Sequence, residues 1–188
     1  MSKNIFKDRE SALEYEFFHR VDDELLARLK AKLDFEQQEH ALADATGIKD
    51  EAVLAELVEL GISSETIFAL SLLPLIRVAW ADGKIADKER DAILQAAHST
   101  GHERDTASHH LIDEWLNHEP TEKLKRAWED YVHAICETIS PNAKAMLKND
   151  VIERSRRIAE SAGGILGFHW ISEGQQAVLN EIAETFDR

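Results

Sequence analysis

The chain has 188 residues, 44% of them hydrophobic, with only eight Gly and three Pro. This length allows one domain with a proper core, and this composition fits an all-helical protein rather than a disordered chain or a β-sandwich. The 36 acidic and 22 basic residues give a net charge of −14, which repels nucleic acid and anionic membranes. Nucleic-acid binding is therefore excluded, and a protein partner with a basic surface is favoured.

The sequence predicts a cytoplasmic protein with no membrane insertion. Residues 1–11 lack the apolar run of a signal peptide. No later segment reaches the roughly 20 apolar residues that a membrane-spanning helix needs. The single cysteine, Cys136, cannot form an intramolecular disulfide, and its apolar neighbours favour a packing role over a nucleophilic one.

The N-terminal third predicts a long amphipathic helix from about Asp8 to Leu33. Its apolar side chains recur at helical spacing and are Leu13, Phe17, Phe18, Val21, Leu25, Leu26, Leu29 and Leu33. Residues 1–66 hold 16 acidic and 8 basic residues. Such a charged face is either simply solvated or a docking surface for a basic partner. We divide the chain into an acidic N-terminal helical extension, residues 1–63, and a helical bundle, residues 64–188.

A helical hairpin is expected next. Its two helices are predicted at Glu36–Thr46 and Asp50–Leu60. Gly47 and Gly61 follow these helices and are placed to end them in the left-handed conformation. Ser63 or Ser64 is then expected to cap the start of the following helix.

The most apolar stretch runs from Ile67 to Ala81, where only Ser71 and Arg77 are polar. Apolar surface on every side predicts the central helix of a bundle. Pro74 lacks a backbone N–H, so a kink or break is expected near Leu70–Leu73.

The rest of the chain predicts five amphipathic helices. They are expected at about Asp87–Ser99, Asp105–Asn117, Thr121–Thr138, Pro141–Ala162 and Glu173–Phe186. Short loops favour antiparallel packing of neighbours. The predicted fold class is an all-α bundle of about eight or nine helices.

Two segments, Ile76–Ala97 and Arg157–Phe186, share one pattern: a helix, a Gly-containing turn, an Ile, a cap position and an amphipathic helix. This internal helix–Gly-turn–helix repeat aligns Ala86 with Ser172 and Glu89 with Gln175. Ser172 and Gln175 predict a capping box, in which two side chains satisfy two backbone N–H groups reciprocally. The first copy keeps only the Glu89 half.

The segment AWADGKIADKERDAIL, with its A-D-G-x-I-x-x-x-E core, resembles the tellurite-resistance TerB-like helical domain over about residues 64–188. The resemblance implies a compact all-α interaction or sensing module without catalysis, associated with bacterial tellurite and metal stress responses. The second copy departs from the pattern, because Ala162 stands opposite Asp82 and the insertion ILGFHW lengthens the turn. This departure speaks against a symmetric site with two acids.

A shorter and weaker resemblance concerns the N-terminal third. The stretches FKDRESALEYEF at Phe6–Phe17 and ALADATGIKDEA at Ala41–Ala52 are similar to the zeta-type inhibitor subunit of some bacterial ATP synthases.

Asp82, Asp87 and Glu89 are the candidate metal ligands, because oxygen ligands in a turn and the following helical turn suit Ca²⁺ or Mg²⁺. Compared with a calcium-binding EF-hand loop, however, Val78 and Trp80 occupy positions that require acids. The alternative is structural, since acidic side chains stabilise a helix N-terminus by about 0.3–1 kcal/mol each.

A second candidate for metal binding lies between His98 and His118. Histidines and acids spaced four apart share a helix face and suit Zn²⁺ or Ni²⁺. These residues are His98, His102, His109, His110, Asp113 and Glu114, with Gly101 interrupting the first pair. His109 with Asp113 is the best local pair, but no third ligand is evident, so exposed titrating histidines are the alternative.

The sequence contains none of the common phosphate-binding, hydrolase or zinc-protease motifs. We therefore expect a non-catalytic interaction module in a stress response that docks partners on its acidic surface. A divalent-cation sensor using Asp82, Asp87 and Glu89 is the alternative. An enzyme with a pocket near His133 or His169, and assembly into a homo-oligomer, are left open.

Overall fold

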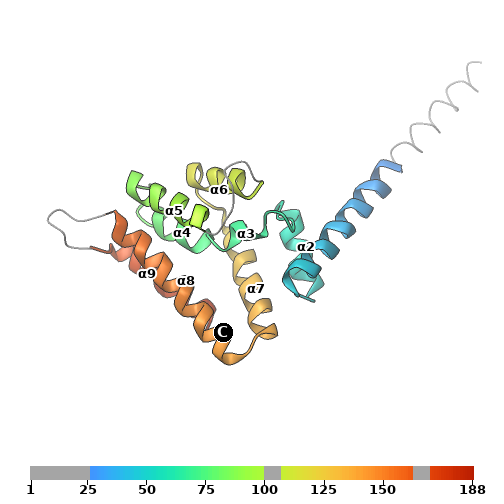
Figure 1. Cartoon of the computed structure of the whole chain (residues 1–188). Coiled ribbons are helices and arrows are strands. Elements are labelled where there is room, and N and C mark those ends of the chain that lie inside the picture. Colours follow the sequence, from blue (N-terminus) through green and yellow to red (C-terminus); the bar gives the residue numbers. More distant parts are fainter. Residues whose placement is uncertain (1–25, 100–106, 163–169) are drawn as a thin grey trace, which may run out of the picture.

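The computed structural model describes residues 26–99, 107–162 and 170–188 (Figure 1). Within these ranges every regular element of secondary structure is a helix, which confirms the predicted all-α bundle. A first helix occupies residues 26–46, followed by α2 (Glu51–Glu59), α3 (Ile67–Leu70), α4 (Leu73–Trp80), α5 (Asp87–Ser99), α6 (Ala107–Asn117), α7 (Glu122–Thr138), α8 (Pro141–Ser161) and α9 (Glu173–Thr185). None of the helices in this part of the chain is long and apolar enough to cross a membrane.

The short helix α4 forms the centre of the bundle. Every residue from Leu73 to Ala79 is buried, and α4 packs against α5, α8 and α9 (Figure 1). The apolar stretch breaks between Leu70 and Leu73, so the predicted interruption is confirmed. Pro74 lies in the first turn of α4, where a backbone N–H has no partner within the helix in any case.

One hydrophobic core joins the bundle to the second half of the N-terminal extension. Leu42, Ile48, Leu57 and Ile62 are each at most 2% exposed and belong to the same buried cluster as Phe186 near the C-terminus. Helix α2 packs against α7. Buried side chains of the extension thus pack into the core of the bundle and hold the two parts together.

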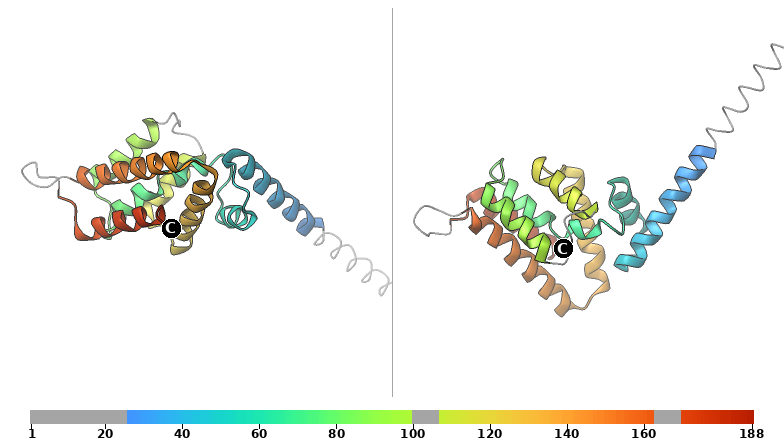
Figure 2. Two further views of the ribbon diagram at one scale, coloured as in Figure 1. Left: turned by 90° about the horizontal axis from the view of Figure 1, so that it is seen from below. Right: turned by 45° about the horizontal axis from the view of Figure 1, so that its top comes forward.

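The helix of residues 26–46 is continuous, so the prediction of a break between Leu33 and Glu36 was wrong. The segment contains no Gly or Pro, and Asp34 and Phe35 continue the helix. Phe35 packs against the core, whereas residues 26–34 project away from the bundle (Figures 1 and 2). The helix therefore has an anchored half and a solvated half.

The prediction that glycines end the first two helices is confirmed, whereas the prediction of a serine cap on the next helix was wrong. Gly47 and Gly61 have φ values of 75° and 77°, as expected of left-handed caps. Neither Ser63 nor Ser64 caps the central segment; the cap residue of α3 is Thr66, and its side chain makes no capping bond to α3. Instead the Thr66 hydroxyl accepts a hydrogen bond from the Ser63 N–H at 2.7 Å, because Ser63 to Thr66 form a turn of their own.

Candidate functional site

Glu89, one of the three predicted metal ligands, is a buried structural residue. It lies in the first turn of α5 and is 2% exposed. One carboxylate oxygen, Oε2, accepts a hydrogen bond from the Ala86 N–H at 2.8 Å. The other, Oε1, accepts one from the Gln175 side-chain amide, also at 2.8 Å. Both oxygens of Glu89 are therefore engaged inside the protein.

The second repeat supplies the matching groups. The Ser172 hydroxyl accepts from the Gln175 N–H, and Gln175 Oε1 accepts from the Ser172 N–H, both at 3.1 Å, so the predicted capping box is confirmed. The same hydroxyl donates to Asp82 Oδ1 at 2.7 Å. We call Asp82, Ala86, Glu89, Ser172 and Gln175 the inter-repeat lock. Each repeat uses its own helix-capping groups to bind the other.

Gly174 allows the two repeats to approach this closely. A Cβ atom at this position would lie 3.0 Å from the Ala81 carbonyl oxygen and 3.3 Å from Asp82 Oδ1. A side chain here, in the first turn of α9, would make these contacts tight and would require the Ala81 backbone to shift slightly.

The pKa of Glu89 is raised above its ordinary value. Burial of the carboxylate is the largest cause, and the negative charge of Asp82 adds to it. The hydrogen bonds from the Ala86 N–H and the Gln175 side chain act in the opposite direction without outweighing burial. Ionised Glu89 is thus held in the fold at a cost in desolvation.

Asp87 stands apart from the inter-repeat lock. Its side chain is exposed on the first turn of α5. Across the described ranges, no three His, Cys, Asp or Glu side chains are grouped so that they could hold a metal ion. The structure therefore brings Asp82 and Glu89 into one hydrogen-bonded cluster but does not gather all three acids, and binding of Ca²⁺ or Mg²⁺ stays a prediction.

Two of the candidate histidines meet from different helices. The rings of His98 on α5 and His109 on α6 are stacked, with centroids 5.6 Å apart and an interplanar angle of 6°. Their separation in sequence concealed this contact. His118 Nδ1 lies 3.1 Å from Glu114 Oε1, the i,i+4 arrangement that the spacing allows. His102 falls outside the described residues.

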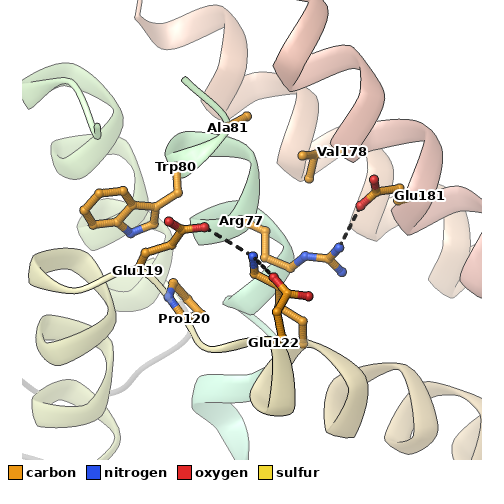
Figure 3. Close-up of a pocket in the computed structure, with 9 residues that line it drawn as sticks. Arg77, Trp80, Ala81, Glu119, Pro120, Glu122, Val178 and Glu181 are labelled. Carbon is orange, nitrogen blue, oxygen red and sulfur yellow. Dashed lines mark hydrogen bonds and ion pairs between the residues drawn. The ribbon is translucent and has the colours of Figure 1, made fainter. Parts of the chain in front are cut away.

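A pocket of about 320 Å³ lies where α4, α7, α9 and the loop before α7 meet (Figure 3). It is lined by Arg77, Trp80, Ala81, Glu119, Pro120, Glu122, Lys125, Val178 and Glu181. We call it the acid-rimmed pocket, because three of these residues are glutamates at its edge and the two cations lie deeper.

Lys125 holds two of the rim glutamates. Its Nζ atom donates to Glu122 Oε1 at 2.8 Å and to Glu119 Oε1 at 3.2 Å. The lysine side chain is only 18% exposed, whereas those of Glu119 and Glu122 are 54% and 74% exposed. The hydrogen bond from Lys125 lowers the pKa of Glu122. Burial lowers the pKa of Lys125, but its bonds to Glu122 and Glu119 outweigh burial and raise that pKa.

Arg77 forms the floor of the pocket. Its side chain is 6% exposed, and Nη2 donates to Glu181 Oε2 at 3.0 Å. Nη1 lies 3.9 Å from Glu129 Oε1 and makes no hydrogen bond, while the guanidinium carbon lies 5.8 Å from the centre of the Trp128 ring. Arg77 is therefore held by ion pairs and an aromatic face within an apolar helix.

Trp80 forms one wall of the pocket (Figure 3). The indole N–H donates to the Trp115 carbonyl oxygen at 2.9 Å, which fixes the orientation of the ring. This bond links α4 to α6, so the wall is set by two helices. An aromatic face beside carboxylates is a surface that can receive a cation.

The rim glutamates keep capacity for a ligand. Glu119, Glu122 and Glu181 each place one oxygen on an internal cation, and their second oxygens make no hydrogen bond within the described residues. The sequence did not predict this site, because the rim comes from both the α7 region and α9. Arg77 in the apolar stretch was the one available signal.

Of the two histidines considered for an enzymatic pocket, only His133 lies within the described residues. His133 Nε2 lies 2.9 Å from the Thr185 carbonyl oxygen, and its ring thus joins α7 to α9. Cys136 packs against the core, and its burial raises the pKa of its thiol. The raised pKa favours the thiol over the reactive thiolate. Trp170 is 76% exposed, and His169 lies outside the described residues.

Comparisons with protein-family models, curated proteins and solved structures found no match to this chain. The inter-repeat lock and the acid-rimmed pocket therefore carry the functional argument.

Proposed function

We propose that this chain is a non-catalytic, TerB-like interaction module that acts in the cytoplasm in a bacterial stress response. It docks a protein partner through a basic segment. The observation that carries the proposal is the acid-rimmed pocket, in which three glutamates present unengaged carboxylate oxygens beside an ordered indole.

The pocket suits an arginine or lysine side chain of the partner. A guanidinium can donate to two carboxylate oxygens at once and stack on an aromatic face. Glu119 and Glu122 supply carboxylates on one side of the pocket, and Trp80 supplies the face. The net charge of −14 attracts a basic partner over a longer range and speeds its approach.

The state of the rim carboxylates supports binding rather than catalysis. A glutamate that donates a proton in catalysis needs a raised pKa. The pKa of Glu122 is lowered instead, so this side chain stays ionised and attractive to a cation at neutral pH. Lys125 and Arg77 are already held by glutamates, which makes them supports of the rim.

Binding of a labelled arginine-rich peptide, followed by fluorescence anisotropy, tests the proposal. Replacing Glu119→Gln and Glu122→Gln together should weaken binding about tenfold, since each rim charge contributes up to about 1 kcal/mol. The matched control replaces Glu65→Gln and Glu153→Gln, two exposed acids outside the pocket. It removes the same charge.

The control separates a site from general attraction. If both double variants weaken peptide binding equally, the protein's net charge alone accounts for it and the pocket is not the docking site. If neither changes binding, a basic partner does not use this surface. A circular dichroism spectrum of each variant verifies that the helices are retained.

A further inference from the structure

A second hollow, of about 460 Å³, lies between α5 and α8, which pack against each other (Figure 1). We call it the α5–α8 groove. It shares no residue with the acid-rimmed pocket, and its volume is within the range of small-molecule sites, roughly 300–1,000 Å³. The lining residues are Leu75, Ala92, Gln95, Ala96, Ser99, Asp150, Arg154, Arg157 and Ile158.

The floor of the α5–α8 groove is apolar. Leu75 of α4 and Ile158 of α8 are 1% and 4% exposed, so their side chains close the bottom. Ala92 and Ala96 lie four residues apart on one face of α5 and are half-buried. Their small side chains leave the space between the two helices, and an apolar group placed there would lose contact with water.

Two arginines three residues apart on α8 line the same groove, and most of their hydrogen-bonding capacity is unused. Arg157 is exposed and makes no hydrogen bond or ion pair with any described residue. Arg154 has a 28% exposed side chain and one ionic partner, since its Nη1 atom lies 3.4 Å from Asp150 Oδ2. A guanidinium group carries five N–H donors in a fork that matches a carboxylate.

Gln95 offers a further donor from α5. Its side-chain amide makes no hydrogen bond within the described ranges and lines the groove. The Ser99 hydroxyl, in contrast, already donates to the Ala96 carbonyl oxygen at 2.8 Å and keeps only its capacity to accept. The unused donors of the groove therefore come from Gln95, Arg154 and Arg157.

We propose that the α5–α8 groove binds a small organic acid, a carboxylate attached to an apolar body. The carboxylate accepts hydrogen bonds from Arg157 and Gln95, and the body lies on the apolar floor. The contact between Arg154 and Asp150 shows that a carboxylate suits this end of the groove. A single negative charge is favoured over a phosphate dianion, because Asp150 and the net charge of −14 repel the second charge. This site is independent of the acid-rimmed pocket.

Titration of the full chain with octanoate, followed by amide NMR spectra, tests the proposal. Saturable shifts are expected at the Gln95 side chain and along α5 and α8. Octanol has a similar body without the charge, and acetate has the charge without the body, so each should bind at least about fivefold more weakly. If octanol or acetate bound as tightly as octanoate, the groove would not combine the two interactions and the proposal would be wrong.

Arginine variants locate the binding site. Arg157→Gln should weaken octanoate binding about tenfold, because it removes a charge-assisted bidentate contact. Arg157→Lys keeps the charge but not the fork and should recover only part of the affinity. The matched control is Lys84→Gln, which removes the same charge at an exposed lysine outside the groove and should leave binding unchanged. Equal losses for Arg157→Gln and Lys84→Gln would assign binding to general attraction and overturn the proposal.

Asp150→Asn should have the opposite effect. It frees Arg154 and removes a like charge from the groove, so octanoate should bind about two- to threefold more tightly. A gain in affinity does not arise from damage to the fold, which separates this result from a structural effect. Unchanged or weaker binding would contradict the proposed place of the carboxylate.

A flotation experiment distinguishes a free organic acid from a membrane surface. The chain should not float with phosphatidylglycerol vesicles, whose surface is anionic like the protein. Flotation that depends on Arg157, without NMR shifts from octanoate, would mean that the arginines bind lipid headgroups and that the proposal is wrong.

Discussion

Carboxylates gather at two places on this protein, and their surroundings differ. In the inter-repeat lock, Glu89 is 2% exposed, and both of its oxygens accept hydrogen bonds from the protein itself. In the acid-rimmed pocket, Glu119 and Glu122 are more than half exposed, and each shares only one oxygen with Lys125. Glu89 therefore keeps no oxygen for a ligand, whereas each of these two rim glutamates keeps one.

This difference shows that the number of acidic residues in a segment is a poor guide to a binding site. Asp82, Asp87 and Glu89 are close in sequence, but Asp87 stands apart, and the other two bind the second repeat. Unused carboxylate oxygens at an ordered pocket are the better indicator. Mutations at the two places should accordingly affect different properties, stability at the lock and binding at the pocket.

The largest loss of stability is expected for Glu89→Ala. It removes the acceptor of the Ala86 N–H and of the buried Gln175 amide, and unsatisfied buried donors cost about 1–3 kcal/mol each. We expect the free energy of unfolding in urea to fall by about 2–4 kcal/mol. Glu153→Ala, at an exposed position, should change it by less than about 0.5 kcal/mol. If both variants lost the same free energy of unfolding, Glu89 would contribute no more to stability than an exposed acid.

A smaller but more specific effect is expected at Ser172. Ser172→Ala removes a helix cap and the contact with Asp82, at a cost of about 1–2 kcal/mol. Ser172→Asp restores a good capping group but sets a second carboxylate against Asp82, so it should not recover stability.

Ser140 provides the matched control for this substitution, because it caps α8 through the Ala143 N–H and no other hydrogen bond of its side chain is found within the described residues. Ser140→Asp should leave the free energy of unfolding nearly unchanged. If aspartate is tolerated equally at both positions, the contact between Ser172 and Asp82 does not contribute to stability.

The raised pKa of Glu89 predicts a pH dependence of opposite sign to that of most acids. Because the folded state binds this proton more tightly than the unfolded state, stability from this group falls as the pH rises through the interval above the ordinary glutamate pKa. Relative to Glu89→Gln, the wild-type protein should therefore gain stability on acidification through that interval. Urea titrations of both proteins at a series of pH values measure the difference, and a constant difference would contradict the prediction.

Most of the fold follows from local sequence signals. Pro74 marked the break before α4, Gly47 and Gly61 marked helix ends, and Ser140 before Pro141 marked the start of α8. These signals act within one turn of backbone. The prediction of a break between Leu33 and Glu36 was wrong for a local reason too, because that stretch contains no Gly or Pro to end the helix.

The site was less predictable than the fold, because its residues meet only through packing. Gln175 and Glu89 are hydrogen-bonded although they are 86 residues apart in the sequence, and Arg77 and Glu181 are 104 residues apart. The repeat aligned Glu89 with Gln175, but two matching positions need not touch. Which carboxylates become buried depends on how the helices assemble, and neither spacing nor composition determines that.

The smallest effect on stability is expected at the pocket rim, for Glu119→Gln combined with Glu122→Gln. Exposed ion pairs contribute about 0–1 kcal/mol, so urea unfolding should change by no more than about 1 kcal/mol. Lys125, with an 18% exposed side chain, keeps access to water and to the two side-chain amide oxygens. A loss as large as that of Glu89→Ala would mean that the rim, like the inter-repeat lock, mainly holds the fold together. A near-constant stability with weakened peptide binding would instead separate the two clusters by function, since only the exposed one can exchange an internal partner for an external one.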